Sequence, residues 1–134
     1  MLTALSISHY AIVDALEIEF APGLTVVTGE TGAGKSIMID ALALTLGDRA
    51  DAGAVRPGAD RADIVATFDV SRLEAARGWL AERELDADGD CILRRTVGAD
   101  GRSRAFINGK PSTLADLKAV GELLIDIHGQ HEHQ

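Results

Sequence analysis

The sequence predicts an α/β fold with a mixed sheet, a glycine-rich loop and an antiparallel β subdomain. The first observation is a glycine-rich stretch at residues 29–36, which follows a short apolar run and precedes a helix-like run. The second is that two strand-like segments come before this stretch. The third is that strands outnumber helices after it, whereas a simple doubly wound domain alternates strand and helix strictly.

The first half of the chain is expected to contain three strands and one helix. Residues 13–20 alternate between apolar and polar side chains, which predicts a half-exposed strand. Residues 48–63 are rich in Gly, Ala, Asp and Arg, which predicts a surface loop. The three strands are expected at 2–7, 13–20 and 24–28, and the helix at 35–46, where Gly47 ends it.

The second half is expected to contain more strands than helices. Ser71 is the expected cap of a helix, with Glu74 in the capping-box position. Asn108–Pro111 is an expected turn. The strands are expected at 64–70, 91–97, 103–107 and 125–128, and the helices from Ser71 to about Glu84 and from Ser112 or Thr113 to about Leu124.

Composition limits the class of protein. The 134 residues suffice for one domain, and 46% apolar with 25% charged residues is typical of a globular chain with an aliphatic core. The net charge of −8 argues against strong wrapping of DNA by this segment alone. Arg94-Arg95 and Arg102–Arg104 are the candidate basic spots, and the simpler interpretation of both is solvated strand and turn charge.

Cysteine use and hydropathy point to the cytoplasm. The chain has one cysteine, Cys91, so an internal disulfide is impossible, which fits a reducing compartment. Cys91 lies in an apolar run and is expected to be an inert core residue. No stretch approaches the roughly 18 continuous apolar residues of a membrane helix. The N-terminus also lacks the basic and then apolar pattern of a secretory signal.

Residues 29–36 fit G-x-x-x-x-G-K-[ST], the phosphate-binding loop (Walker A motif) of P-loop NTPases. Its glycines lack a Cβ, so backbone amides can curl round a β-phosphate. Lys35 is expected to reach the β- and γ-phosphates of ATP, and Ser36 to bind the Mg²⁺ that bridges them. The predicted ATP-binding residues are Thr28, Gly29, Glu30, Thr31, Gly32, Ala33, Gly34, Lys35 and Ser36.

The second acidic residue of a P-loop NTPase is missing from its expected place, the end of an apolar strand. Asp126 comes closest, but its strand is expected to continue. The spacing of His128, His131 and His133 is not a common zinc frame, so roles near the nucleotide or at the surface stay open. Either the NTPase is unusual, or the chain is one half of a site. The last residues lack a tail-like composition, which favours the half-site.

The order of these motifs closely resembles the RecN family of bacterial DNA repair proteins, from the first residues to Gln134. RecN proteins are similar to SMC proteins, in which a long antiparallel coiled coil splits an ABC-type ATPase head. The resemblance implies that residues 1–134 are the N-terminal lobe of an ABC/SMC-type head, and that the C-terminal lobe and coiled coil are absent from this chain. It is carried by the glycine loop and by residues 40–42, 46–50, 106–110 and 126–134.

The resemblance implies further site residues. The Q-loop of ABC-type heads supplies a glutamine that meets Mg²⁺ and the attacking water, and within residues 128–134 the best match is Gln130, with Gln134 second. The implied catalytic residues are therefore Lys35 and Gln130, and the implied Mg²⁺ ligands are Ser36 and Gln130.

Two residues are candidates for contacts with the nucleotide outside the phosphates. SMC-like heads often place an arginine from the loop after the P-loop helix against the nucleotide. Arg56 is the match, and a solvated loop arginine is an equal alternative. Tyr10 is the candidate for stacking on adenine.

The implied function is ATP-driven head dimerisation that clamps or tethers DNA in double-strand-break repair and recombination. The implied partners are the C-terminal lobe of the same head, a second RecN-like protomer and DNA, at the nucleoid in the bacterial cytoplasm. No membrane contact is expected, and the chain alone is expected to lack ATPase activity. The alternatives are a nucleotide-gated structural module without turnover and the nucleotide-binding subunit of an ABC transporter.

Overall fold

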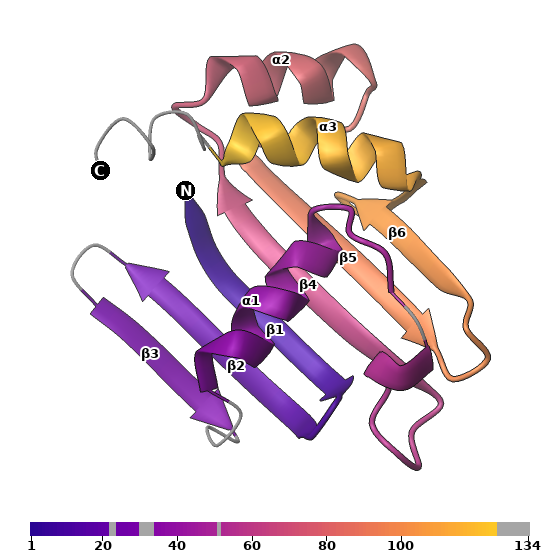
Figure 1. The fold of residues 1–134 in the computed structure, drawn as a ribbon. Helices are drawn as coiled ribbons and strands as arrows, with labels where there is room; N and C mark the ends of the chain where they lie inside the picture. The colour runs from indigo at the N-terminus through magenta and orange to yellow at the C-terminus, as the bar shows by residue number, and fades with distance from the viewer. Residues whose placement is uncertain (22–23, 30–33, 51, 126–134) are drawn as a thin grey trace.

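One seven-stranded sheet is the scaffold of the computed structural model, which describes residues 1–21, 24–29, 34–50 and 52–125. The strands are β1 (Leu2–Tyr10), β2 (Val13–Ala21), β3 (Leu24–Gly29), β4 (Arg61–Asp69), β5 (Asp90–Gly98), β6 (Ser103–Ile107) and β7 (Lys110–Ser112). The helices are α1 (Gly34–Thr45), the 3₁₀ helix η1 (Ala52–Ala54), α2 (Glu74–Glu82) and α3 (Leu114–Leu124). Figure 1 shows α1 crossing one face of the sheet, with α2 and α3 side by side at one end.

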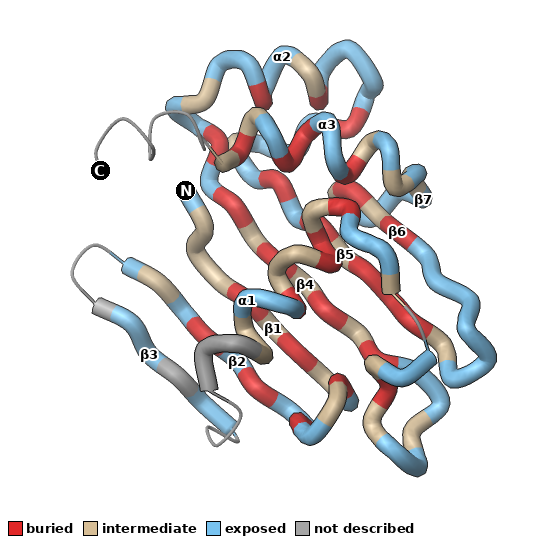
Figure 2. Tube along the Cα trace, in the orientation of Figure 1, coloured by how far each residue is buried: buried red, intermediate tan, exposed pale blue. Residues whose placement is uncertain are grey.

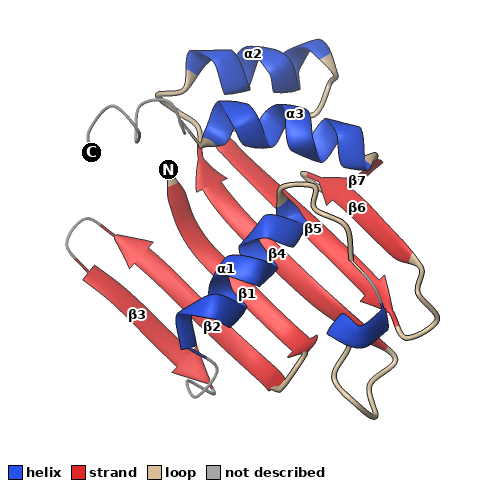
Figure 3. Ribbon diagram, in the orientation of Figure 1, coloured by secondary structure: helices blue, strands red, loops and turns tan. Residues whose placement is uncertain are grey.

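The strand order is β3-β2-β1-β4-β5-β6-β7, and each pairing within the described residues is antiparallel. The strand that precedes the glycine loop is therefore an edge strand of the same sheet as the later strands (Figure 3). This confirms the predicted antiparallel β structure. Parallel pairing, the other part of the predicted mixed sheet, does not occur among the described residues.

Two boundary predictions were wrong because tertiary packing extends the strands. The predicted loop at 48–63 contains η1 and the first residues of β4. Ala62 is the first inward residue of β4 and is fully buried, but a single alanine gives a weak hydrophobic signal in the sequence. The strand β7 was not predicted, and it begins at Lys110, inside the predicted Asn108–Pro111 turn.

The predicted cap of α2 was also wrong. The N-cap is Leu73, which makes no side-chain capping bond. Ser71 instead donates its amide (2.9 Å) and its hydroxyl (2.7 Å) to Oδ1 of Asp69. These bonds hold the pKa of Asp69 below its ordinary value. Short polar side chains compete for local backbone groups in this way, so a capping pattern need not become a cap.

The start of α3 agrees with its prediction. Thr113 is the N-cap, and its hydroxyl accepts the Asp116 amide at 3.0 Å in a reciprocal capping box. The helix ends at Leu124, and the backbone of its C-cap residue, Ile125, is extended. The rest of the predicted strand at 125–128 lies outside the described residues.

Aliphatic side chains form the core between the sheet and the helices. Figure 2 shows buried positions alternating with more exposed ones along the central strands. Leu5, Ile7, Ile64 and Leu93 are at most 1% exposed. Cys91 is fully buried beside them, and burial raises the pKa of its thiol to about 12. The thiol is therefore protonated and shielded, as predicted for an inert core residue.

Arg95 is the one fully buried charged side chain among the described residues. Its Nη1 donates to the carbonyl oxygens of Leu44 (2.7 Å) and Asp48 (2.8 Å), and its Nη2 donates to Oγ of Ser103 (3.3 Å). The interpretation of Arg94-Arg95 as solvated charges is therefore wrong for Arg95. The carbonyls at a helix C-terminus lack intrahelical partners and carry partial negative charge, which the guanidinium satisfies.

Replacing Arg95 tests this role. Arg95→Leu should lower the free energy of unfolding by about 2 to 4 kcal/mol, because buried carbonyls at the end of α1 lose a charged donor. Arg94→Leu is the matched control. Arg94 pairs with Asp63 on the half-exposed outer face, so its loss should cost about 1 kcal/mol or less. Denaturant unfolding of both variants measures the difference, and equal losses would contradict the assignment.

Candidate nucleotide-binding site

The strand and the helix predicted on either side of the glycine motif are present. The strand β3 ends at Gly29 and α1 begins at Gly34. Lys35 and Ser36 therefore lie in the first turn of α1, where backbone N–H groups have no intrahelical partner and favour an anion. The structure does not describe the four residues between the two elements, Glu30, Thr31, Gly32 and Ala33. Their predicted contacts with ATP therefore stay predictions.

Gly29 is required at the end of β3 for two independent reasons. Its φ of +107° lies in the region that favours glycine. A Cβ at this position would also stand 2.4 Å from the carbonyl oxygen of Ala15 on the neighbouring strand. The chain can thus leave β3 towards α1 while β3 stays close to β2. Thr28, the preceding residue, is exposed and lies opposite Glu17 of β2.

The turn between β1 and β2 lies at the same end of the sheet as Gly29, which pairs with Leu16 near the start of β2. The segment that contains Arg56 is bonded to this turn. The Ala11 amide donates to the carbonyl oxygen of Ala54 at 2.7 Å, and the Arg56 amide donates to the carbonyl oxygen of His9 at 2.8 Å. The Arg56 guanidinium also donates to the Ile12 carbonyl. The fold thus brings Arg56 to the end of the sheet at which β3 finishes.

A hollow of about 540 Å³ opens at this edge and is lined by His9, Asp14, Arg56 and residues 57–61. Nε2 of His9 and Oδ1 of Asp14 lie 3.3 Å apart, and the two side chains are 50% and 60% exposed. Arg56 has further N–H donors beyond the one bonded to Ile12, since a guanidinium carries five. Tyr10 is only 7% exposed, so its ring offers little surface for stacking on a base.

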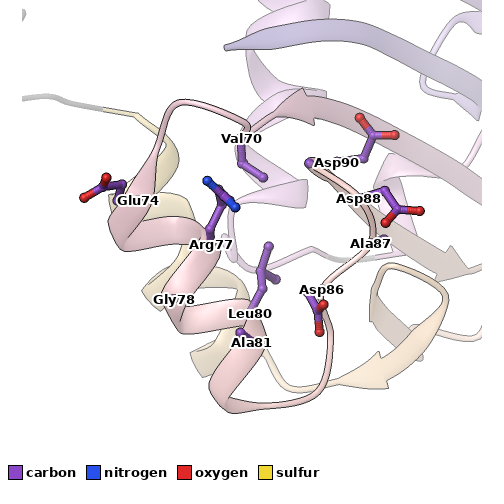
Figure 4. Close-up of a pocket in the computed structure, with 11 residues that line it drawn as sticks. Val70, Glu74, Arg77, Gly78, Leu80, Ala81, Asp86, Ala87, Asp88 and Asp90 are labelled. Carbon is purple, nitrogen blue, oxygen red and sulfur yellow. The ribbon is translucent and has the colours of Figure 1, made fainter.

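A second hollow, of about 550 Å³, lies beside α2 at the opposite end of β4 (Figure 4). Four carboxylates line it: Glu74, Asp86, Asp88 and Asp90. They outnumber the single arginine, Arg77, so the local charge would repel a triphosphate. This contrast favours the α1 edge as the phosphate site.

The remaining site predictions concern residues near the end of the sequence. Asp126, Gln130, Gln134 and the histidines His128, His131 and His133 lie outside the described residues. Within the described part of the chain, no group of three or more His, Cys, Asp or Glu side chains is placed to hold a metal ion. In that part, no helix combines the length and apolar character needed to cross a bilayer.

Asn108 has a structural role that the sequence did not reveal. Its Nδ2 donates to the Leu85 carbonyl at 2.6 Å, and its Oδ1 accepts the Ile92 amide at 2.8 Å. Lys110 donates to the Glu84 carbonyl at 2.7 Å. These bonds fasten the loop after α2 to the β6–β7 turn, at a φ of +48° that asparagine tolerates at Asn108. The 106–110 stretch, noted above only for its resemblance, is thus a clamp away from the α1 edge.

Comparison with known proteins identifies the class. Residues 4–103 match the AAA domain family, and the chain belongs to that family. Over its full length the chain is 53% identical to the DNA repair protein RecN of Vibrio cholerae and 44% identical to that of Bacillus subtilis. It spans 24% and 23% of these relatives, at their N-terminal ends. The predicted resemblance to the N-terminal part of RecN is confirmed.

Solved structures confirm the predicted fold class. A structure described for ATP-driven dimerisation and DNA-stimulated activation of SMC ATPases aligns with a TM-score of 0.68 at 21% identity, over 92% of this chain and 78% of that one. The SMC head domain of Thermotoga maritima aligns with a TM-score of 0.55 at 17% identity, over 88% and 41%. At these identities the similarity establishes the fold, an ABC/SMC-type N-terminal lobe.

Substitution of Gly29 tests whether its geometry sets the edge of the site. Gly29→Ala should destabilise the protein by about 1 to 3 kcal/mol, because it combines a strained φ with backbone crowding. It should also weaken binding of an ATP analogue. Gly78→Ala is the control, since Gly78 lies in α2 with open space around it and gains helix propensity. Equal changes in thermal stability in the two variants would refute the requirement for glycine at position 29.

Proposed function

We propose that the chain is the ATP-binding lobe of a RecN-like, SMC-family ATPase in DNA double-strand-break repair and recombination. The main supporting observation is the change of chain direction at Gly29, which requires glycine, with α1 beginning five residues later at Gly34. Because the chain spans about a quarter of its curated relatives, the activity and partners of the complete protein are proposals.

The chemistry proposed for this edge is phosphate binding and charge stabilisation. The amides of residues 29–36 and of the first turn of α1 would bind the β-phosphate, and Lys35 would stabilise negative charge on the transferred phosphoryl group. Ser36 would hold Mg²⁺, which neutralises charge between the β- and γ-phosphates when bound. This donor set, one hydroxyl beside phosphate oxygens, suits a magnesium ion that keeps several waters. Arg56 would add a guanidinium from the adjoining hollow.

A C-terminal lobe of the same head is proposed to complete the site. The strand β3 is an edge strand of the sheet and exposes Val26 (46%), while α1 exposes Ile39 (60%). Apolar side chains exposed on an edge strand and on the helix that follows it in the chain favour coverage by another element. The whole chain, 1–134, is thus proposed as one lobe with a P-loop at 29–36 and a Q-loop at 128–134 that supplies Gln130.

Two such heads would sandwich ATP and couple its binding and hydrolysis to clamping or tethering DNA. The proposal places the complete protein at DNA in the bacterial cytoplasm. The AAA-domain membership and the similarity to RecN support ATP as the ligand.

Lys35→Ala tests the assignment in the complete protein. Loss of the ammonium should lower the ATP hydrolysis rate by about 100-fold or more, because it removes stabilisation of the transferred phosphoryl group. Lys118→Ala, an exposed lysine on α3, is the matched control and should hydrolyse ATP normally. Near-normal turnover by Lys35→Ala would defeat the proposal.

Mixing the two halves of the head tests the composite site. The 134-residue chain alone should show no ATP turnover above background, and adding a separately expressed C-terminal lobe should restore it. ATP binding without turnover in the reconstituted mixture would instead support a nucleotide-gated structural module. Robust hydrolysis by the chain alone would contradict the composite site.

A further inference from the structure

The face of the sheet away from α1 has an uneven distribution of charge. Residues that pair directly across antiparallel strands lie on the same face. One such row crosses the sheet as Glu17, Ser6, Val65, Arg94 and Phe106. Since Arg95, the neighbour of Arg94, bonds to α1, this row lies on the opposite, outer face. That face is therefore acidic at β2 and basic at β5.

Arginines gather on the outer face at one end of β4, β5 and β6. Arg104 pairs with Thr96 on the outer row next to Arg94, Arg61 lies at the start of β4, and Arg102 lies in the β5–β6 turn. They line a hollow of about 610 Å³ together with Asp60 and Asp100. We call the four arginines, Arg61, Arg94, Arg102 and Arg104, the arginine face.

Three of these side chains are free to meet a ligand. The side chain of Arg102 is 88% exposed, with a loose 3.8 Å contact to Asp100. Arg61 and Arg104 are exposed, and within the described residues neither has a carboxylate at ion-pair distance. Four arginines face three aspartates here, Asp63 included, so the patch has a net charge of +1 in a chain of −8.

Arg94 gives the patch a fixed centre. Its Nε and Nη2 donate to the two carboxylate oxygens of Asp63 at 3.0 and 2.6 Å, and these bonds raise the pKa of Arg94. The same guanidinium lies over the ring of Phe106, 5.4 Å from its centroid. The aromatic face is therefore already occupied by a cation, so it is a poor platform for an unstacked base.

We propose that the arginine face binds the phosphate backbone of double-stranded DNA. The donors are spread over a strand face and a turn instead of converging on one point, which suits a line of phosphates better than a single anion. Guanidinium groups bind phosphates through paired hydrogen bonds. Glu17 and Glu19, at the β2 end of the same outer face, repel the duplex and confine it to β4–β6. This inference rests on the proposed function for the presence of DNA.

The test uses the complete protein and a fluorescent DNA duplex. The variant Arg61→Gln/Arg102→Gln/Arg104→Gln removes three outer charges and keeps the Arg94–Asp63 pair. The matched control, Arg72→Gln/Arg77→Gln/Arg83→Gln, removes three arginines from α2 and from the residues that flank it, for the same change in net charge. Binding is measured by anisotropy at several salt concentrations.

Loss of three phosphate contacts should reduce the slope of log K against log salt by about 2 to 3, at roughly 0.9 per contact. Duplex affinity near 0.1 M salt should fall about tenfold or more in the outer-face variant and stay near wild type in the control. Arg104→Gln alone should reduce the slope by about 0.9. It supplies a single-site check with minimal effect on folding.

Nucleotide binding separates this inference from the proposed function. Arg104→Gln and the α2 triple variant change no residue that lines the hollow beside Arg56. Both should bind a fluorescent ATP analogue as wild type does, whereas Lys35→Ala should not. Equal salt slopes for the two triple variants would overturn the DNA assignment and leave ATP binding intact. A wild-type protein that binds no duplex would also overturn it.

Discussion

The guanidinium of Arg95 fixes the position of α1, on which the candidate site depends. A charge moved from water into a protein interior costs several kcal/mol unless it is fully compensated. Here much of the compensation comes from the carbonyl of Leu44, in the last turn of α1, and from that of Asp48, just beyond the helix. Arg95 belongs to β5 in the middle of the sheet, so this end of the helix is bonded to the scaffold. Because a helix is stiff, the opposite end, with Lys35 and Ser36, is positioned as well.

Two glycines allow α3 to pack closely against the same end of α1. Gly47 has a φ of +106°, and a Cβ there would lie 3.1 Å from the Leu114 carbonyl oxygen. A Cβ on Gly121 of α3 would lie 3.1 Å from a methyl group of Leu46. The C-terminal end of α1 is thus held by the Arg95 guanidinium from the sheet and by the close packing of α3.

Local patterns in the sequence predicted the features that local chemistry determines. Thr113 begins α3 because a threonine hydroxyl reaches the amide three residues on, whatever the rest of the fold does. The glycine motif predicted a strand, a loop and a helix because its requirements lie within eight residues. Ser71 shows the limit of such patterns, since Asp69 lies close enough to compete for its hydroxyl.

Features that depend on distant residues could not be predicted from the sequence. Arg94 and Arg95 are adjacent and chemically identical, yet one faces solvent and the other the core, because strand register alternates the faces. Nothing in the letters Arg-Arg reveals which face α1 covers. The position of Arg56 likewise depends on bonds to His9 and Ile12, more than forty residues earlier in the chain.

The burial of Cys91 has a practical consequence. The only thiol of this segment is protonated and enclosed between the sheet and the helices, so maleimide dyes and cross-linkers would not react with it. A cysteine introduced at an exposed position such as Ile39 would then be the only reactive handle on the segment. Spectroscopic distances between α1 and whatever docks against it become accessible without first removing the native sulfur.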